Sequence, residues 1–191
     1  MNKTQFLNQF QHAKIIQHDA DYPLKTSGRP AAVLLPIIEY SEQLSVLFTL
    51  RAKHLKHHGG QISFPGGKQE TSDSNLLDTA LRETAEEVGI QREQIDIIGQ
   101  LPVYRTITGF EVTPYIGFVT PTSKLILDEN EVHSTFEVPL EFLIDQTNHF
   151  VHMVNRKNIP HPVYFIPWQE HNIWGATAAF VRTLSNHLQH T

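Results

Sequence analysis

The chain has 191 residues, which suits one domain with a sizeable core, and we expect a single domain over residues 1–191 with its core at about 30–185. The formal net charge is −5 and no long basic run is present, which argues against nucleic acid as a partner but leaves a phosphorylated small molecule open. There are no cysteines, which excludes disulfides, and no apolar run approaches the roughly 20 residues that span a bilayer. We therefore expect a cytoplasmic protein without a membrane segment.

The apolar runs predict many strands and few helices. A helix is expected at 2–14, with Phe6, Leu7 and Phe10 on one side. Runs at 31–38 and 44–50 read as buried strands joined by a hairpin, which would place Pro36 at a bulge or a sheet edge. The later predicted elements are strands at 96–101, 112–119 and 132–138, a helix at 140–144, a hairpin at 150–166 and a helix at 173–188. This order predicts an α/β fold, an α/β/α sandwich around a mixed β-sheet.

The centre of the chain, residues 66–90 (GGKQETSDSNLLDTALRETAEEVGI), predicts a loop followed by an amphipathic helix. Ser72, Asp73 or Ser74 is expected to cap this helix, and Gly89 to end it. Its apolar stripe consists of Leu77, Leu81, Thr84 and Val88.

Three carboxylates, Glu83, Glu86 and Glu87, share an arc beside that stripe. Like charges at this spacing destabilise a helix by a few tenths of a kcal/mol per pair. Such a face is most often solvated surface, but a divalent cation would turn the repulsion into a binding site, and oxygen ligands suit Mg²⁺ or Mn²⁺.

The same stretch resembles a Nudix box, in which a glycine and an early Glu precede the pattern Arg-Glu-apolar-x-Glu-Glu-x-Gly-apolar. Residues 82–90 (RETAEEVGI) fill its second half, with Thr84 where an apolar residue is usual. In the first half Asp73 replaces the early Glu, counted from Gly67, and Arg82 comes one residue late. The resemblance implies a Nudix-type sandwich and a catalytic metal site on Glu83, Glu86 and Glu87. It implies that Glu83 and Glu87 are the main metal ligands and that the Gly67 carbonyl is a further ligand. Arg82 is expected to orient a carboxylate.

A second pattern lies upstream, where residues 47–52 (LFTLRA) are followed by Lys56, Gly60 and residues 64–67 (FPGG). It is similar to the signature of the coenzyme A pyrophosphatase branch of Nudix hydrolases, with Lys56 in place of an Arg. That resemblance implies hydrolysis of coenzyme A to 3′,5′-ADP and 4′-phosphopantetheine. Cationic residues of this loop, Arg51, Lys56 and His58, are the expected phosphate-binding residues.

Several alternatives stay open at this point. The nearest rival to coenzyme A hydrolysis is a Nudix hydrolase of ADP-ribose, a dinucleotide or a nucleoside triphosphate. A catalytically silent nucleotide-binding module is a further alternative. The general base is either a box glutamate or a later carboxylate such as Glu131 or Glu137. The apolar sides of the two terminal helices suggest a homodimer. His54, His57 and His58 are closely spaced, but no cysteine or carboxylate at ligand spacing supports a zinc site.

Overall fold

The computed structural model describes residues 1–12, 27–41, 43–120 and 125–189. The helices are α1 (Lys3–His12), α2 (Leu76–Val88), α3 (Leu140–Ile144) and α4 (Gly175–Gln189), with 3-10 turns η1 (Arg92–Gln94) and η2 (Gln146–Asn148). The strands are β1 (Arg29–Glu39), β2 (Leu44–Arg51), β3 (Ile62–Ser63), β4 (Gly66–Lys68), β5 (Ile95–Gln100), β6 (Tyr104–Arg105), β7 (Phe110–Val119), β8 (Val132–Pro139), β9 (Phe150–Arg156), β10 (Ile159–Trp168) and β11 (His171–Trp174). Residues 13–14 of the first predicted helix lie outside the described residues.

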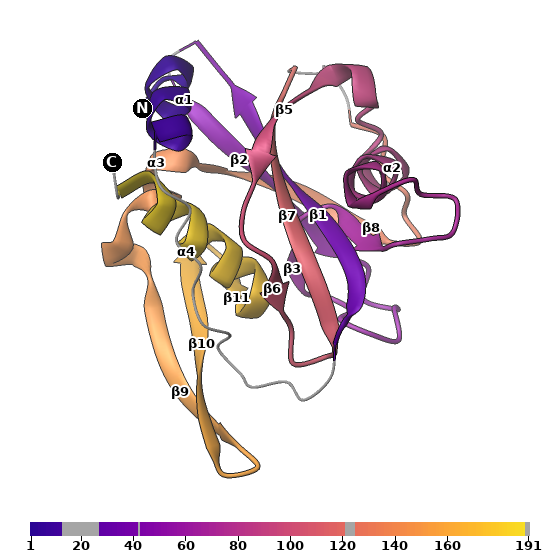
Figure 1. The fold of residues 1–191 in the computed structure, drawn as a ribbon, viewed down its shortest axis with the longest axis vertical. Helices are drawn as coiled ribbons and strands as arrows, with labels where there is room; N and C mark the ends of the chain where they lie inside the picture. Colours follow the sequence, from indigo (N-terminus) through magenta and orange to yellow (C-terminus); the bar gives the residue numbers. More distant parts are fainter. Residues whose placement is uncertain (13–26, 42, 121–124, 190–191) are drawn as a thin grey trace.

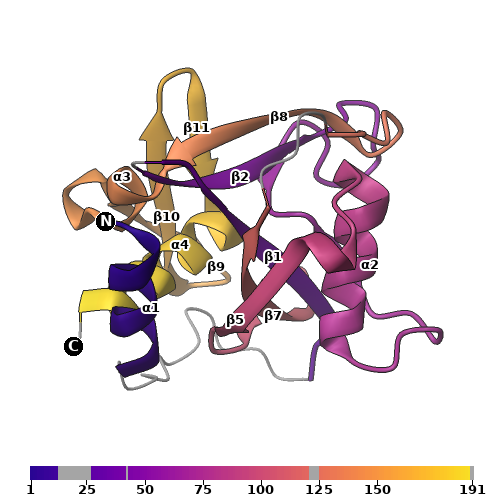
Figure 2. The same cartoon turned by 90° about the horizontal axis from the view of Figure 1, so that it is seen from above.

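The predicted α/β/α sandwich is confirmed. The main sheet has the order β3-β2-β1-β7-β5, in which β1 and β7 are parallel and the other neighbouring pairs along this path are antiparallel, so the sheet is mixed. Helix α2 covers one face, and α4 with α1 covers the other (Figures 1 and 2). A small second sheet, β11-β10-β9, lies beside α4. No helix in the described part of the chain is long and apolar enough to cross a membrane.

Each face of the main sheet has its own apolar cluster. The larger one includes Phe6, Phe48 and Phe180 and lies between the sheet and the helices α1 and α4. The smaller one lies under the end of α2 and consists of Ile38, Leu47, Val88, Ile90 and Val119. Burial of these side chains is the main force that holds α2, and the carboxylates that it carries, against the sheet.

The two prolines in central strands lie where a strand changes partners. The prediction that Pro36 lies at a sheet edge is wrong, because β1 is central. On the side away from β7, however, β1 pairs with β4 at 31–33 and with β2 at 37–39, so Pro36 falls in the gap. Pro114 falls in a similar gap of β7, between its pairings with β6 and with β5. A missing N–H is tolerated at both positions because, although the β1–β7 ladder runs through them, the ladders on the other side of each strand do not include either proline.

The ends of α2 differ in part from the prediction. None of the three predicted caps is used, and the Asn75 side chain instead accepts a hydrogen bond from the Asp78 N–H at 2.9 Å. Gly89 ends the helix in the left-handed conformation, with φ 76°, as predicted. Thr84 is fully buried in the apolar stripe because its hydroxyl donates to the Ala80 carbonyl.

Candidate functional site

Three carboxylates from two parts of the chain meet beside the C-terminal half of α2. Glu83 and Glu87 lie one helical turn apart, and Glu131 comes from the loop that leads into β8. One oxygen of each lies within 4.8 Å of the others. The loop is held there by two backbone hydrogen bonds, from Ala52 N to the Glu131 carbonyl at 2.8 Å and from Asp128 N to the Glu87 carbonyl at 3.1 Å. The cluster therefore depends on pairing between distant segments as well as on helical spacing.

The cluster is electrostatically unfavourable without a cation. Only 2% of the Glu87 side chain is exposed, and burial raises the pKa of Glu87 to about 8, with Glu83 and Glu131 adding to the shift. Burial also raises the pKa of Glu83. Glu87 Oε1 lies 3.3 Å from Arg51 Nη1, but its Oε2 is buried and has no hydrogen-bond partner among the described residues. A free buried oxygen beside two further carboxylates fits a divalent cation such as Mg²⁺ or Mn²⁺.

The two glycines of β4 allow a close approach to this cluster. Gly66 has φ 153°, a conformation that L-residues rarely adopt, and a Cβ there would overlap the Ala32 carbonyl. A Cβ on Gly67 would overlap the Glu83 carboxylate. The backbone of Gly67 thus lies directly against a carboxylate of the cluster, at the position where the resemblance places a carbonyl ligand.

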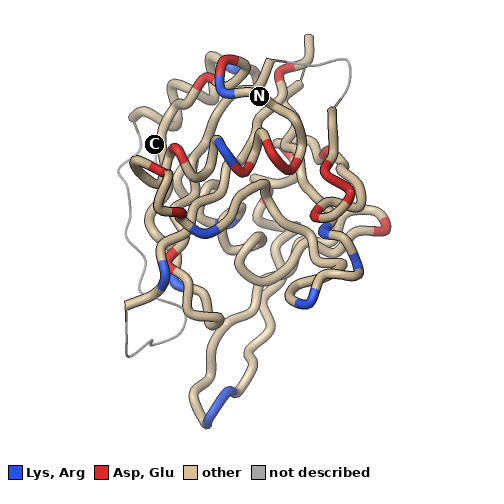
Figure 3. The backbone as a smooth tube through the Cα atoms, turned by 90° about the vertical axis from the view of Figure 1, so that its right-hand side faces the viewer, with Lys and Arg blue, Asp and Glu red and all other residues tan. Residues whose placement is uncertain are grey.

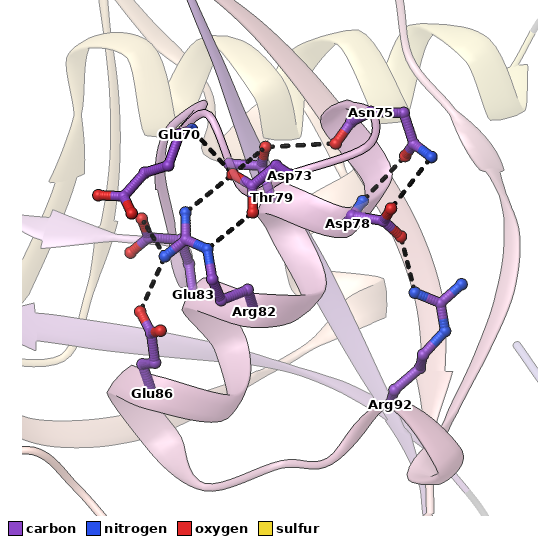
Figure 4. Close-up of polar contacts among 9 residues, drawn as sticks. All are labelled: Glu70, Asp73, Asn75, Asp78, Thr79, Arg82, Glu83, Glu86 and Arg92. Carbon is purple, nitrogen blue, oxygen red and sulfur yellow. Dashed lines mark hydrogen bonds and ion pairs between the residues drawn. The ribbon is translucent and has the colours of Figure 1, made fainter.

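Arg82 links the preceding loop to the helix (Figure 4). Its Nε and Nη2 donate to the two carboxylate oxygens of Asp73 at 2.9 and 3.0 Å, and its Nη1 lies 3.1 Å from Glu83 Oε1 and 2.9 Å from Glu86 Oε2. These hydrogen bonds with Arg82 hold the pKa of Asp73 well below its usual range. Asp73 therefore orients Arg82, and Arg82 in turn restrains Glu83.

Of the three predicted helix carboxylates, Glu86 is the one that lies outside the cluster. Its side chain is 58% exposed and pairs with Arg82 one turn earlier on the helix. Glu131 takes the third place. From the sequence Glu131 is only one of several candidate bases, because nothing local to 125–131 indicates that it reaches α2. Its alternative, Glu137, accepts a hydrogen bond from the Tyr40 hydroxyl at 2.9 Å and is not part of the cluster.

A cavity of about 520 Å³ opens next to the cluster. Its lining includes the cationic side chains of Arg51 and Lys68 and the imidazoles of His57 and His58, and the described residues that line it include no acid. Aromatic side chains from both sheets and α4 form much of the rest, namely Phe64, Tyr104, Phe110, Tyr164, Trp174 and Phe180. Arg51, Gly66 and Gly67 are shared between the cavity and the surroundings of the carboxylates. The site therefore has an end with three carboxylates and a largely apolar end whose lining includes Arg51 and Lys68.

The predicted phosphate-binding residues are placed differently from one another. Arg51 lies between Glu87 and the cavity, with Glu131 Oε2 at 3.9 Å from its Nη2. His58 lines the cavity and contacts Gln61 through Nδ1 at 2.8 Å. Lys56 is exposed and is not among the lining residues. Lys68, which was not among the predicted phosphate-binding residues, does line the cavity, and it lies on β4 opposite Ala31 of β1.

Residues 28–162 match the family model of the NUDIX domain. Proteins named uncharacterized Nudix hydrolase NudL are 39% identical in Enterobacter sp. (strain 638), over 82% of this chain and 81% of that protein, and 36% identical in Yersinia enterocolitica, over 95% and 91%.

Two crystal structures share the fold at 21% sequence identity. A C. elegans Ap4A hydrolase binary complex superposes with a TM-score of 0.50 over 61% of this chain and 83% of that one. The Nudix hydrolase RenU of M. smegmatis superposes with a TM-score of 0.51 over 63% and 76%. At this level of identity the similarity concerns the fold alone.

Proposed function

The chain belongs to the Nudix family of hydrolases, and from that premise we propose that it hydrolyses the diphosphate link of coenzyme A with the help of Mg²⁺ or Mn²⁺. The products are 3′,5′-ADP and 4′-phosphopantetheine. The observation that carries this proposal is the cluster of Glu83, Glu87 and Glu131 beside a cavity with a cationic rim.

The metal is assigned to Glu83, Glu87 and Glu131, with the Gly67 carbonyl as a further oxygen ligand. Glu86 acts from outside, through its ion pair with Arg82. A bound dication supplies charge neutralisation on the diphosphate oxygens and a lowered pKa for a coordinated water. This assignment is supported by the buried Glu87 Oε2, which has no other partner among the described residues.

The chain's own residues bind and orient the substrate. Arg51 and Lys68 donate charge-assisted hydrogen bonds to phosphate oxygens, and the aromatic walls of the cavity pack against an uncharged part of the substrate. A water oxygen bonds to one phosphorus while the bridging P–O bond to that phosphorus breaks, and the bridging oxygen leaves with the other phosphate. Glu131, which is 46% exposed, takes the proton of this water and returns it to solvent.

The choice of coenzyme A within the family rests on the upstream signature. Its residues Arg51, Phe64, Gly66 and Gly67 line the cavity directly beside the carboxylates. Coenzyme A carries a 3′-phosphate in addition to its diphosphate, so its site needs cations beyond the metal. Four cationic or imidazole side chains on the rim meet that need.

A substrate panel tests the proposal. Purified protein is incubated with Mg²⁺ or Mn²⁺ and with coenzyme A, 3′-dephospho-coenzyme A, ADP-ribose or a dinucleoside polyphosphate, and the products are separated by ion-exchange chromatography. We expect 3′,5′-ADP from coenzyme A at the highest kcat/KM. Faster release of AMP from ADP-ribose would assign a different Nudix substrate. Tight binding with no turnover under either metal would indicate a silent module.

A further inference from the structure

Strand β9 is an unpaired edge. It forms one side of the small sheet β11-β10-β9, and among the described residues no strand lies along its other side. All seven residues of β9 are exposed. Figures 1 and 3 show the β9–β10 hairpin extending away from the body of the molecule. An exposed edge presents free backbone N–H and C=O groups to any other strand, so proteins usually protect it.

Within the part of the chain that the structure describes, β9 lacks most of the usual protections. The strand has no proline and no acidic residue, and its single charged side chain, Arg156, is at its end. Its pairing with β10 runs through seven consecutive residue pairs without a bulge. Its exposed apolar side chains are Phe150, Val151, Met153 and Val154, of which Met153 is 57% exposed. Such a regular and apolar edge is typical of a strand that pairs with another chain.

The prolines of β10 indicate which backbone groups of β9 point outward. Met153 pairs with Pro162, and Asn155 pairs with Pro160. Proline has no N–H, so these cannot be the pairs that exchange two hydrogen bonds. By the alternation of an antiparallel ladder, Val151, Met153 and Asn155 direct their N–H and C=O groups away from β10.

We propose that β9 pairs antiparallel with β9 of a second copy of this chain, about a two-fold axis at Met153. The outward groups then match one another, with Met153 opposite Met153 of the partner subunit and Val151 opposite Asn155 of the partner subunit. The result is one continuous six-stranded sheet. A two-fold arrangement of this kind needs only one self-complementary surface.

The charges of the hairpin select the antiparallel arrangement. Residues 150–168 contain Arg156 and Lys157 and no acid, and both cations lie at the tip, as Figure 3 shows. In the antiparallel pair Arg156 lies opposite Phe150 of the partner subunit, where a cation over an aromatic ring is favourable. The two tips are then about 20 Å apart, at about 3.4 Å per residue. A parallel pair would bring four like charges together.

Other contacts fit the surface less well. The homodimer expected from the terminal helices loses its basis, because Phe6 and Phe10 are buried within the chain. Insertion into a lipid surface would put the polar tip, Arg156 to Asn158, into the bilayer first, whereas the most exposed apolar side chains lie nearer the base. Pairing with a second copy involves the whole length of β9 and leaves the tips of both β9–β10 hairpins exposed to water.

The molar mass in solution is the first test. Analytical ultracentrifugation of the full chain is expected to show twice 21.8 kDa at high concentration, with reversible dissociation on dilution. Met153→Lys places two cations face to face and is expected to weaken dimerisation at least ten-fold while the circular dichroism spectrum stays unchanged. Val103→Lys is the control, since Val103 is similarly exposed, at 54%, but lies outside the hairpin. A wild-type monomer at every concentration, with or without anionic vesicles, would overturn the proposal.

Crosslinking tests the register without destabilising the strand. The chain has no cysteine, so one introduced thiol reports one position. Met153→Cys is expected to give a covalent dimer with a short bis-maleimide, because this position meets its own copy at the axis. Arg156→Cys is expected to stay monomeric under the same treatment. Equal crosslinking at both positions, or crosslinking at 156 alone, would exclude the proposed pairing.

Discussion

Glu87 is the most buried carboxylate of the cluster, and its charge matters more than its shape. Glu87→Gln keeps the volume and removes the charge, so we expect kcat with Mg²⁺ to fall on the order of 100- to 1000-fold, as when one electrostatic partner of a transition state is lost. Glu86→Gln, on the exposed side of Arg82, is expected to lose less. Steady-state kinetics of both variants on the best substrate of the panel measure the difference.

The fold of these variants is checked separately. Because a buried carboxylate is disfavoured in its charged form, Glu87→Gln should unfold at the same temperature as the wild type or higher when metal is absent. A wild-type rate for Glu87→Gln would remove Glu87 from the metal site.

The raised pKa of Glu87, about 8, predicts how metal binding depends on pH. Below that pH the folded, metal-free protein keeps a proton on Glu87 that a metal must displace. Metal affinity is therefore expected to rise with pH by up to about ten-fold per unit between pH 6 and 8 and then to level off. Titration with Mn²⁺, followed by electron paramagnetic resonance of the free ion, gives Kd at each pH. Equal Kd values at pH 6 and pH 8 would contradict the prediction.

The raised pKa of Glu87 also affects the stability of the metal-free protein, which should decrease with pH whereas metal affinity increases. An unfolded chain releases the Glu87 proton near pH 4.5, whereas the folded metal-free protein holds it until about pH 8. The free energy of unfolding without metal should therefore fall as pH rises through this window. Urea unfolding in the presence of a chelator measures the trend, and Glu87→Gln should reduce its slope.

At the scale of single elements, the sequence was informative wherever a pattern is local. Helical spacing predicted α2, the adjacency of Glu83 and Glu87 and the terminator Gly89, because these depend on residues within one or two turns. Continuous apolar runs predicted β1, β2 and β7 for the same reason. The position of α4 was predicted two residues early, since His171–Trp174 forms β11 by pairing with β10.

The features that were missed depend on contacts between distant segments. The strands β3, β4 and β6 have two or three residues each, too few to show a periodicity, and exist because a longer strand lies beside them. Glu131 reaches Glu87 only because β8 pairs with β2 and brings the preceding loop to the end of α2. Asn75 is the cap because α2 begins at Leu76, later than predicted, and Asp73 instead accepts hydrogen bonds from Arg82.

The loop before α2 is predicted to act on the site through Arg82. Asp73→Asn keeps the size of the side chain but weakens both hydrogen bonds to the guanidinium, so we expect a loss of about 1 to 3 kcal/mol in the free energy of unfolding. Arg82 is then held less firmly beside Glu83, so the Glu83 carboxylate is less well positioned. We therefore expect that a higher Mg²⁺ concentration is needed for half-maximal activity. Asp78 is also on α2, and Asp78→Asn, which loosens its ion pair with Arg92 of η1, serves as the matched control for the metal requirement. An unchanged Mg²⁺ requirement in Asp73→Asn would restrict Asp73 to a structural role.

Across the whole molecule, α4 connects the cavity to the N-terminal helix. Ala176, Thr177 and Phe180, in its first half, line the cavity. In its second half His187 contacts the Phe10 carbonyl through Nε2 at 2.9 Å and packs its ring against Phe10. Helix α1 therefore packs against the end of α4 that is remote from the carboxylates. Contacts of α1 that stabilise the fold are thus separate from the residues proposed to act in catalysis.

This separation predicts that the core under α1 can be weakened without changing catalysis. Phe6 is fully buried and packs against the rings of Phe10 and Phe118, at centroid distances of 5.8 and 5.7 Å. Phe6→Ala should reduce the free energy of unfolding by about 3 to 5 kcal/mol. For a chain of this size each kcal/mol lowers Tm by roughly 2 to 4 °C.

At a temperature well below its Tm, Phe6→Ala should keep the kcat and KM of the wild type, because the two rings that Phe6 packs against, Phe10 and Phe118, are neither cavity-lining nor cluster residues. Differential scanning calorimetry and steady-state kinetics on one preparation give both quantities. Gln5→Ala, on the exposed side of α1, controls for effects of the helix itself. A large fall in kcat in a fully folded variant would contradict the prediction and would show that α1 influences the site through α4.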